Sequence, residues 1–154
     1  MALKPDRKYG IGVDISYFSS SATAERGGVM VHDTAGSGAA MDDATALVKY
    51  PSSVSGTYPA GVLLNDIVDL DLTRQHINWH KDEVQLGGKV TLLRQGDVVT
   101  NVVATGLTIS AGQAAYYNTT GAFTNVQPAG GTQVGRFLST LDADGYAKIA
   151  VNIT

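Results

Sequence analysis

The stretch GQAAYYNTTGAFTNV (residues 112–126) has the pattern of a β-hairpin. Apolar and aromatic residues run up to Tyr117, a polar turn follows at residues 118–121, and Phe123 restarts the apolar pattern. Tyr and Phe suit a half-buried pleated surface, whereas Asn and Gly tolerate the positive φ that a tight reversal needs. The stretch therefore predicts two short antiparallel strands joined by a turn.

Strand patterns continue on both sides of this hairpin. Residues 62–75 alternate apolar and polar side chains, which predicts one strand with a wet, acidic face. Residues 89–103 contain two β-branched runs around a glycine, consistent with either a hairpin or one long strand bent at that glycine. Residues 133–140 and 146–153 flank an Asp- and Gly-containing turn at residues 141–145. No segment has a convincing helical period. We therefore predict an all-β fold, either a small β-barrel or a sandwich.

The first 40 residues differ from the rest of the chain. They alternate small and polar residues, although residues 28–32 (GVMVH) have the pattern of a brief strand. They hold too few bulky apolar side chains to offset a backbone ordering cost of roughly 1–2 kcal/mol per residue. We therefore expect an extended N-terminal arm at residues 1–40, either disordered or held by a partner, and a compact β domain at residues 41–154.

The amino-acid composition argues against several classes of function. A chain of 154 residues can bury roughly 68–70% of its unfolded surface, so it needs no metal or disulfide for stability. Charged residues make up only 16% of the chain, against about 25% in typical soluble domains, so much of the surface is small and uncharged. Such a surface suits packing against other proteins. The net charge of −3, without a basic stripe, argues against nucleic-acid binding. With no membrane-spanning apolar run and no secretory signal in the sequence, we expect synthesis in a cytoplasm and no membrane partner.

The strongest metal candidate is the pair His76 and His80, with Asp82 or Glu83 as a third ligand. The pair lacks the glutamate of the HExxH zinc helix, and ordinary solvated or interface histidines explain it better. The turn at residues 142–145 starts like a calcium loop but lacks the later carboxylates. We therefore predict no metal site.

Catalytic patterns are equally sparse. The glycines of residues 34–40 fit neither a phosphate-binding loop nor a nucleophile elbow, and cysteine is absent from the chain. The carboxylate pair Asp69 and Asp71 is better explained by the wet face of a strand than by glycoside hydrolysis. We therefore predict that the protein is not an enzyme and binds no cofactor.

Three segments, in this order, resemble the head decoration (cement) proteins of tailed bacteriophages. In that group a hairpin, a strand with the pattern VGxxL and a closing strand after DG follow one another, and here these are residues 112–124, 134–138 and 144–149. The resemblance covers roughly residues 76–154. It implies a small β-barrel or β-tulip-like domain, made in the bacterial host, that decorates the outer capsid surface of the virion. It further implies a homo-oligomer, often a trimer, that clamps neighbouring subunits of the phage major capsid protein and has no enzymatic activity.

From this resemblance we form a hypothesis about how the N-terminal arm binds the capsid. Residues 9–18 or 28–32 would supply a strand that pairs with an exposed sheet edge of the shell protein, and repetition around a symmetric shell would add avidity. The candidate capsid-contact residues are Tyr9, Ile11, Val13, Ile15, Tyr17, Val29 and Val31.

The alternative is a carbohydrate- or receptor-binding β domain of a phage fibre or bacterial surface protein. A sugar-binding surface would then be lined by Tyr58, Tyr116, Tyr117 and Trp79, although aromatic residues at strand spacing more often fill a core. Substituting them would abolish sugar binding under this alternative, whereas the cement hypothesis predicts only a folding defect.

Overall fold

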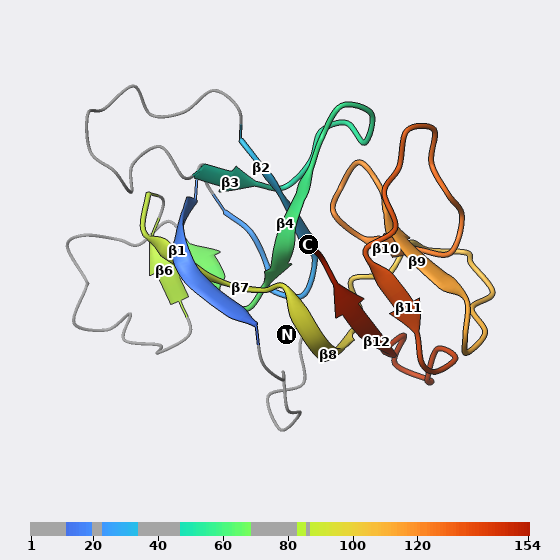
Figure 1. Cartoon of the computed structure of the whole chain (residues 1–154). Coiled ribbons are helices and arrows are strands. Elements are labelled where there is room, and N and C mark those ends of the chain that lie inside the picture. The colour runs from blue at the N-terminus through green and yellow to red at the C-terminus, as the bar shows by residue number, and fades with distance from the viewer. Residues whose placement is uncertain (1–11, 20–22, 34–46, 69–82, 86) are drawn as a thin grey trace.

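The computed structural model of the protein describes residues 12–19, 23–33, 47–68, 83–85 and 87–154 (Figure 1). Within these ranges the chain forms strands and no helix, which confirms the predicted all-β class. No helix of the described residues is therefore long and apolar enough to cross a membrane. The strands are β1 (Val13–Ser19), β2 (Val29–His32), β3 (Leu47–Lys49), β4 (Pro59–Leu63), β5 (Asp66–Val68), β6 (Glu83–Gln85), β7 (Lys89–Leu93), β8 (Gln95–Thr100), β9 (Ala114–Tyr117), β10 (Phe123–Thr124), β11 (Gly135–Phe137) and β12 (Ala147–Asn152).

The N-terminal strands close a small barrel in the order β1-β3-β2-β4-β7, which returns to β1. All neighbours are antiparallel except β1 and β3, which run parallel. The predicted brief strand at residues 28–32 is confirmed as β2. Of the predicted arm, residues 13–19 and 29–32 thus contribute strands to the barrel, while residues 1–11, 20–22 and 34–40 lie outside the described residues. The division of the chain at residue 40 stays a prediction.

The C-terminal strands form a five-stranded sheet in the order β10-β9-β11-β12-β8, seen beside the barrel in Figure 1. The hairpin predicted at residues 112–126 is confirmed, with Phe123 paired to Tyr117 and Thr124 paired to Tyr116. The turn differs in one detail. Only Gly121 takes a positive φ (79°), whereas Asn118 caps the turn by accepting the Thr120 and Ala122 N–H groups on Oδ1.

The segment of residues 89–103 is one run of chain divided between the two sheets. β7 lies in the barrel and β8 in the five-stranded sheet, and the change occurs at Arg94. The Arg94 N–H donates to the Gly12 carbonyl (2.9 Å) on one side, and the Arg94 carbonyl accepts from the Ile153 N–H (2.8 Å) on the other. The two strands therefore do not form a hairpin with each other, and the break lies at Arg94 and not at the glycine, Gly96, where the sequence suggested a bend.

The single strand predicted over residues 62–75 is wrong. β4 ends at Leu63, and the Asn65 side chain interrupts the strand by accepting the Thr91 N–H on Oδ1 (2.7 Å). β5 then pairs in parallel with β6 in a separate two-stranded sheet. Residues 69–75, which carry most of the predicted alternation, lie outside the described residues.

One core joins the barrel to the five-stranded sheet. Val29, Val31 and Val62 of the barrel share a buried cluster with side chains of the sheet, among them Phe123 and Phe137, and all five are 0% exposed. On the opposite faces of the barrel strands a second cluster forms, composed of Met30, Val48, Ala60, Leu63, Ile67, Val90 and Leu92. The barrel strands are thus buried on both faces, which holds the sheet in a fixed position against the barrel.

Candidate functional site

The structure describes the side chains of four of the seven candidate capsid-contact residues, and two of the four are buried. Tyr9 and Ile11 lie outside the described residues, and of Ile15 only the backbone, in β1, is described. Val29 and Val31 are completely buried, and Tyr17 packs against the second core cluster with its ring edge-on to His32 at 5.4 Å. Val13 is the described candidate with an exposed side chain, at 44%.

The strands that carry these residues have neighbours in the barrel. β7 runs along one edge of β1, whereas β3 pairs with the other edge at Phe18 and Ser19 only, and β2 lies between β3 and β4. β2 therefore has a neighbour on both edges, while a role of residues 13–17 in pairing with a shell protein stays a prediction. A second candidate edge lies in the five-stranded sheet.

At one end of that sheet, β10 is covered. The Phe123 N–H donates to the Val102 carbonyl (2.9 Å), and the Phe123 carbonyl accepts from the Ala104 N–H (2.8 Å). These bonds place residues 102–104 along the outer side of β10, so the edge is closed.

At the other end of the sheet, β8 has a neighbour on one side only. It pairs antiparallel with β12 from Thr100↔Ala147 to Gln95↔Asn152. The even-numbered residues of β12 point their backbone groups away from β8, because the Asn152 N–H donates to Val134 and the Lys148 carbonyl accepts from Leu138. Residues opposite each other in an antiparallel pair turn their backbone groups either both inward or both outward.

It follows that Gln95, Asp97 and Val99 turn their N–H and C=O groups to the outer side of β8. No described residue hydrogen-bonds to these groups. β1 does not cover them, because it stops beside β7 and is preceded by Gly12, whose φ of +85° lies outside the extended region. We call this outer side of Gln95, Asp97 and Val99 the open edge.

The net charge of the side chains along the open edge is close to zero. The Asp97 carboxylate lies 3.5 Å from the Lys148 ammonium, and both side chains are about half exposed. Val99 is half-buried and Gln95 is exposed. The strand itself holds no proline or lysine, the residues that commonly prevent pairing at a sheet edge.

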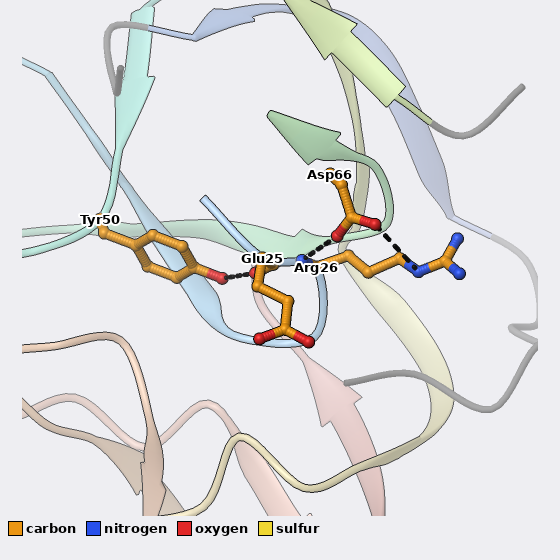
Figure 2. Close-up of polar contacts among 4 residues, drawn as sticks. All are labelled: Glu25, Arg26, Tyr50 and Asp66. Carbon is orange, nitrogen blue, oxygen red and sulfur yellow. Dashed lines mark hydrogen bonds and ion pairs between the residues drawn. The ribbon is translucent and has the colours of Figure 1, made fainter. Parts of the chain in front are cut away.

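A polar cluster connects the loop of residues 23–28 to Asp66 of β5 and to Tyr50, which directly follows β3 (Figure 2). The Asp66 carboxylate accepts the Arg26 backbone N–H (2.8 Å), and its other oxygen lies 3.9 Å from Arg26 Nε. The Tyr50 hydroxyl donates to the Glu25 carbonyl, and burial raises the pKa of Tyr50 well above its usual value, so the hydroxyl stays protonated. This cluster stabilises a loop and offers no reactive group.

A shallow cavity of about 230 Å³ lies where the barrel meets the C-terminal residues. His32, Tyr58 and Gln133 line it, together with residues 152–154. Burial, and secondarily the Arg94 guanidinium, hold the pKa of His32 below its usual value, which favours a neutral ring. The lining shows no converging set of charged groups.

The structure describes only part of the predicted metal candidates, together with the turn at residues 142–145. His76, His80 and Asp82 lie outside the described residues, and Glu83 begins β6. In the part of the chain that the structure describes, no three His, Cys, Asp or Glu residues gather as a metal site. Residues 142–145 form a turn in which Asp142 Oδ1 accepts the N–H groups of Asp144 (3.0 Å) and Tyr146 (2.8 Å).

Of the aromatic residues named for the sugar-binding alternative, Tyr58 is exposed and lines the cavity described above. Tyr117 is 0% exposed, and its hydroxyl is paired with Thr57 Oγ1 at 3.0 Å. Tyr116 is half-buried, and Trp79 lies outside the described residues. Tyr117 therefore belongs to the core, where the cement hypothesis places it.

The barrel, the attached sheet and the open edge together define an all-β protein with a strand edge available for pairing. The family model described as structural cement protein (E217 gp24/Pam3 gp6) matches residues 8–152, and the chain belongs to this family of phage structural proteins. None of the curated proteins matches the chain.

Membership of this family confirms the resemblance drawn from residues 76–154. It also extends that resemblance to the N-terminal part, in which the sequence alone showed no recognisable motif. The family is structural and non-enzymatic, so the protein is a phage structural cement protein without catalytic activity. The site missed by sequence reasoning is the open edge, because the sequence cannot show which neighbour each strand acquires.

Proposed function

We propose that the protein decorates the outer surface of a tailed-phage capsid and stabilises it by clamping neighbouring subunits of the major capsid protein. The observation that carries the proposal is the cement family match over residues 8–152. The fold is compatible with such a role, because a rigid body with one continuous core can transmit load between the shell subunits that it bridges.

The surface composition agrees with this role. Only 16% of the residues are charged, so a large contact area can be buried with few charges to desolvate. Stable protein interfaces have cores depleted in charged residues.

Val13 is the candidate contact residue best suited to a test of capsid binding. Its side chain is exposed, whereas a side-chain contact by Val29 or Val31 would require β2 to leave the barrel. Tyr9 and Ile11 remain candidates for the contact from the residues that precede the barrel.

We also propose that the protein acts as a trimer at three-fold or quasi-three-fold positions of the shell. Three copies bound to a symmetric lattice would bind more tightly than one, because the second and third contacts form at a high effective concentration. Light scattering of the free protein and counting of copies per shell would test this stoichiometry.

The clamp is tested with shells of the cognate phage prepared without this chain. Adding the purified protein should give a saturable bound fraction and raise the temperature at which the shells release their DNA or come apart. An unrelated β protein of similar size serves as the control. Shells that bind none of the protein, or that bind it without any gain in stability, would refute the clamp.

A sugar- or receptor-binding function has less support. Of the three described aromatic residues named for it, Tyr58 is 66% exposed, whereas Tyr117 is buried and Tyr116 is half-buried, so the three do not present their rings together.

A further inference from the structure

We propose that the open edge of β8 binds an extended segment of the major capsid protein, which adds to the five-stranded sheet as a sixth strand. This inference rests on the proposed cement function and names the part of the molecule through which it acts. The open edge consists of the outward-facing N–H and C=O groups of Gln95, Asp97 and Val99.

The first argument is that, among the residues the structure describes, this edge is the one end of the five-stranded sheet without a neighbour. β10, at the other end, bonds to residues 102–104, and the strands of the barrel close on one another. A row of unpaired backbone donors and acceptors on a regular strand is a template for a further strand. β8 also holds no proline or lysine, two of the residues that block pairing at a sheet edge.

The second argument is that β8 is already fixed in position within the protein. The core-facing side chains of β8, Val98 and Thr100, are 0% exposed, and the Thr100 hydroxyl donates to the Gly27 carbonyl (3.0 Å). β8 is therefore held in place from its inner face and from β12. A partner strand would meet a preformed edge and would not have to order it, which lowers the cost of binding.

The third argument separates a shell segment from a second copy of this chain. Two copies of β8 that used the whole open edge would pair about a two-fold axis at Asp97, with Gln95 opposite Val99. That register places the two Asp97 carboxylates directly opposite each other, and like charges in this position are destabilising. A heterologous segment with a cationic or hydrogen-bonding side chain opposite Asp97 avoids the repulsion, and the nearby Lys148 already shows that the carboxylate accepts a cation.

The residues that precede Gly12 are the remaining alternative occupant. Gly12 lies against Gln95, because a Cβ built on it would be 3.0 Å from Gln95 Cβ. Its φ of +85° departs from the extended conformation at this point. The residues before Gly12 lie outside the described part of the chain, and the exchange experiment below distinguishes them from an external strand.

The test variant is Val99→Pro, with Val99→Thr as the matched control. Proline at residue 99 removes an outward-facing N–H and leaves the β8–β12 hydrogen bonds in place, so the protein should fold. Threonine is also β-branched and keeps the N–H. On shells lacking this chain, we expect Val99→Pro to bind at least about tenfold more weakly than wild type and Val99→Thr to bind within about twofold. Equal binding of wild type and Val99→Pro would overturn the open edge while leaving the clamp intact, whereas absent binding by wild type would overturn the clamp itself.

Amide hydrogen exchange of the wild-type protein provides a readout that does not depend on how the variant folds. In the free protein, the amides of Gln95, Asp97 and Val99 should exchange quickly, while those of Val98 and Thr100, which bond to β12, exchange slowly. Binding to shells should protect the first set. Protection already present in the free monomer would assign the edge to residues of the same chain, protection that appears with self-association would assign it to a second copy, and either result would overturn the proposal.

Discussion

The sharpest stability prediction concerns Tyr50, whose ring lies between two glycines from different parts of the fold. A Cβ built on Gly28 would be 2.7 Å from the Tyr50 ring, and a Cβ built on Gly121 would overlap the same ring. Gly28 precedes β2 of the barrel, and Gly121 lies in the β9–β10 turn of the five-stranded sheet. The Gly121 carbonyl also accepts the Val29 N–H (2.8 Å). Tyr50 therefore packs where the two sheets meet, and it fits only because both positions lack a side chain.

Alanine substitutions at three glycines separate two destabilising effects, the strain of a side chain at positive φ and the overlap of a Cβ with the Tyr50 ring. Gly121→Ala incurs both, since residue 121 has a positive φ (79°) and its Cβ would meet the Tyr50 ring. Gly28→Ala incurs the overlap alone, because its φ is not positive. Gly106→Ala incurs the backbone cost alone, because residue 106 has a φ of 77° with open space around it.

The magnitudes follow from these costs. A positive φ costs an L-residue about 1–2 kcal/mol, and overpacking costs about 1–3 kcal/mol. We therefore expect losses in the free energy of unfolding of about 1–2 kcal/mol for Gly106→Ala, about 1–3 kcal/mol for Gly28→Ala and about 2–5 kcal/mol for Gly121→Ala. In a chain of this size each kcal/mol lowers Tm by about 2–4 °C.

Urea unfolding followed by circular dichroism measures these differences, and a double-mutant cycle tests their cause. In a Tyr50→Ala background, the ring is absent and the cost of Gly121→Ala should fall toward that of Gly106→Ala. A residual difference is expected from the Val29 carbonyl, which lies 2.8 Å from the built Cβ. If Gly121→Ala proves no more destabilising than Gly106→Ala, or if the Tyr50→Ala background leaves its cost unchanged, Tyr50 does not hold the two sheets together.

Three further predictions follow from other contacts. Phe137→Ala should lower the free energy of unfolding by about 3–5 kcal/mol in urea titrations, because the ring is fully buried in the shared core; a loss below about 1 kcal/mol would mean that the core is not packed as described. Tyr117→Phe should cost about 0.5–1.5 kcal/mol, because it removes the hydroxyl that pairs with Thr57, and should leave shell binding unchanged; weaker binding by this folded variant would place Tyr117 at an interface. The pKa of His32 is lowered in the folded state, so the unfolded chain binds a proton more readily and stability should fall as the pH drops through 6.5. Wild type should therefore lose more Tm than His32→Gln between about pH 7.5 and pH 5.5, and equal losses would contradict the shift.

The sequence predicted the elements whose signals are local. The hairpin at residues 112–126 and the pair formed by β11 and β12 were predictable because each combines period-two alternation with turn residues at the right place. Only the role of Asn118 was misassigned, since its side chain caps the turn and its backbone does not take a positive φ. Short-range hydrogen bonds of this kind depend only on residues within the turn.

The sequence could not predict features that depend on distant partners, such as the place of the predicted strand β2 inside the barrel. Residues 29–31 form an apolar run because both faces of β2 are buried, by different clusters, and a strand buried on both faces loses its alternation. The interruption at Asn65 depends on a bond to Thr91, 26 residues away. No window of sequence around residue 65 contains that partner, so the alternation of residues 62–75 suggested a strand that does not exist as one piece.

The open edge is a consequence of how the chain passes from the barrel to the sheet. The Arg94 N–H, directly after β7, faces Gly12, directly before β1, whereas from the Arg94 carbonyl onward the even-numbered residues face β12. The reversal at Arg94 turns Gln95, Asp97 and Val99 toward the side on which β1 lies beside β7, and β1 begins only at Val13. The barrel can close only because β1 pairs with β7, and β8 gains β12 only because the chain reverses at Arg94. Among the described residues, the same two features that complete both sheets therefore leave β8 without a second neighbour, and in a family of capsid cement proteins the capsid is the partner available to supply one.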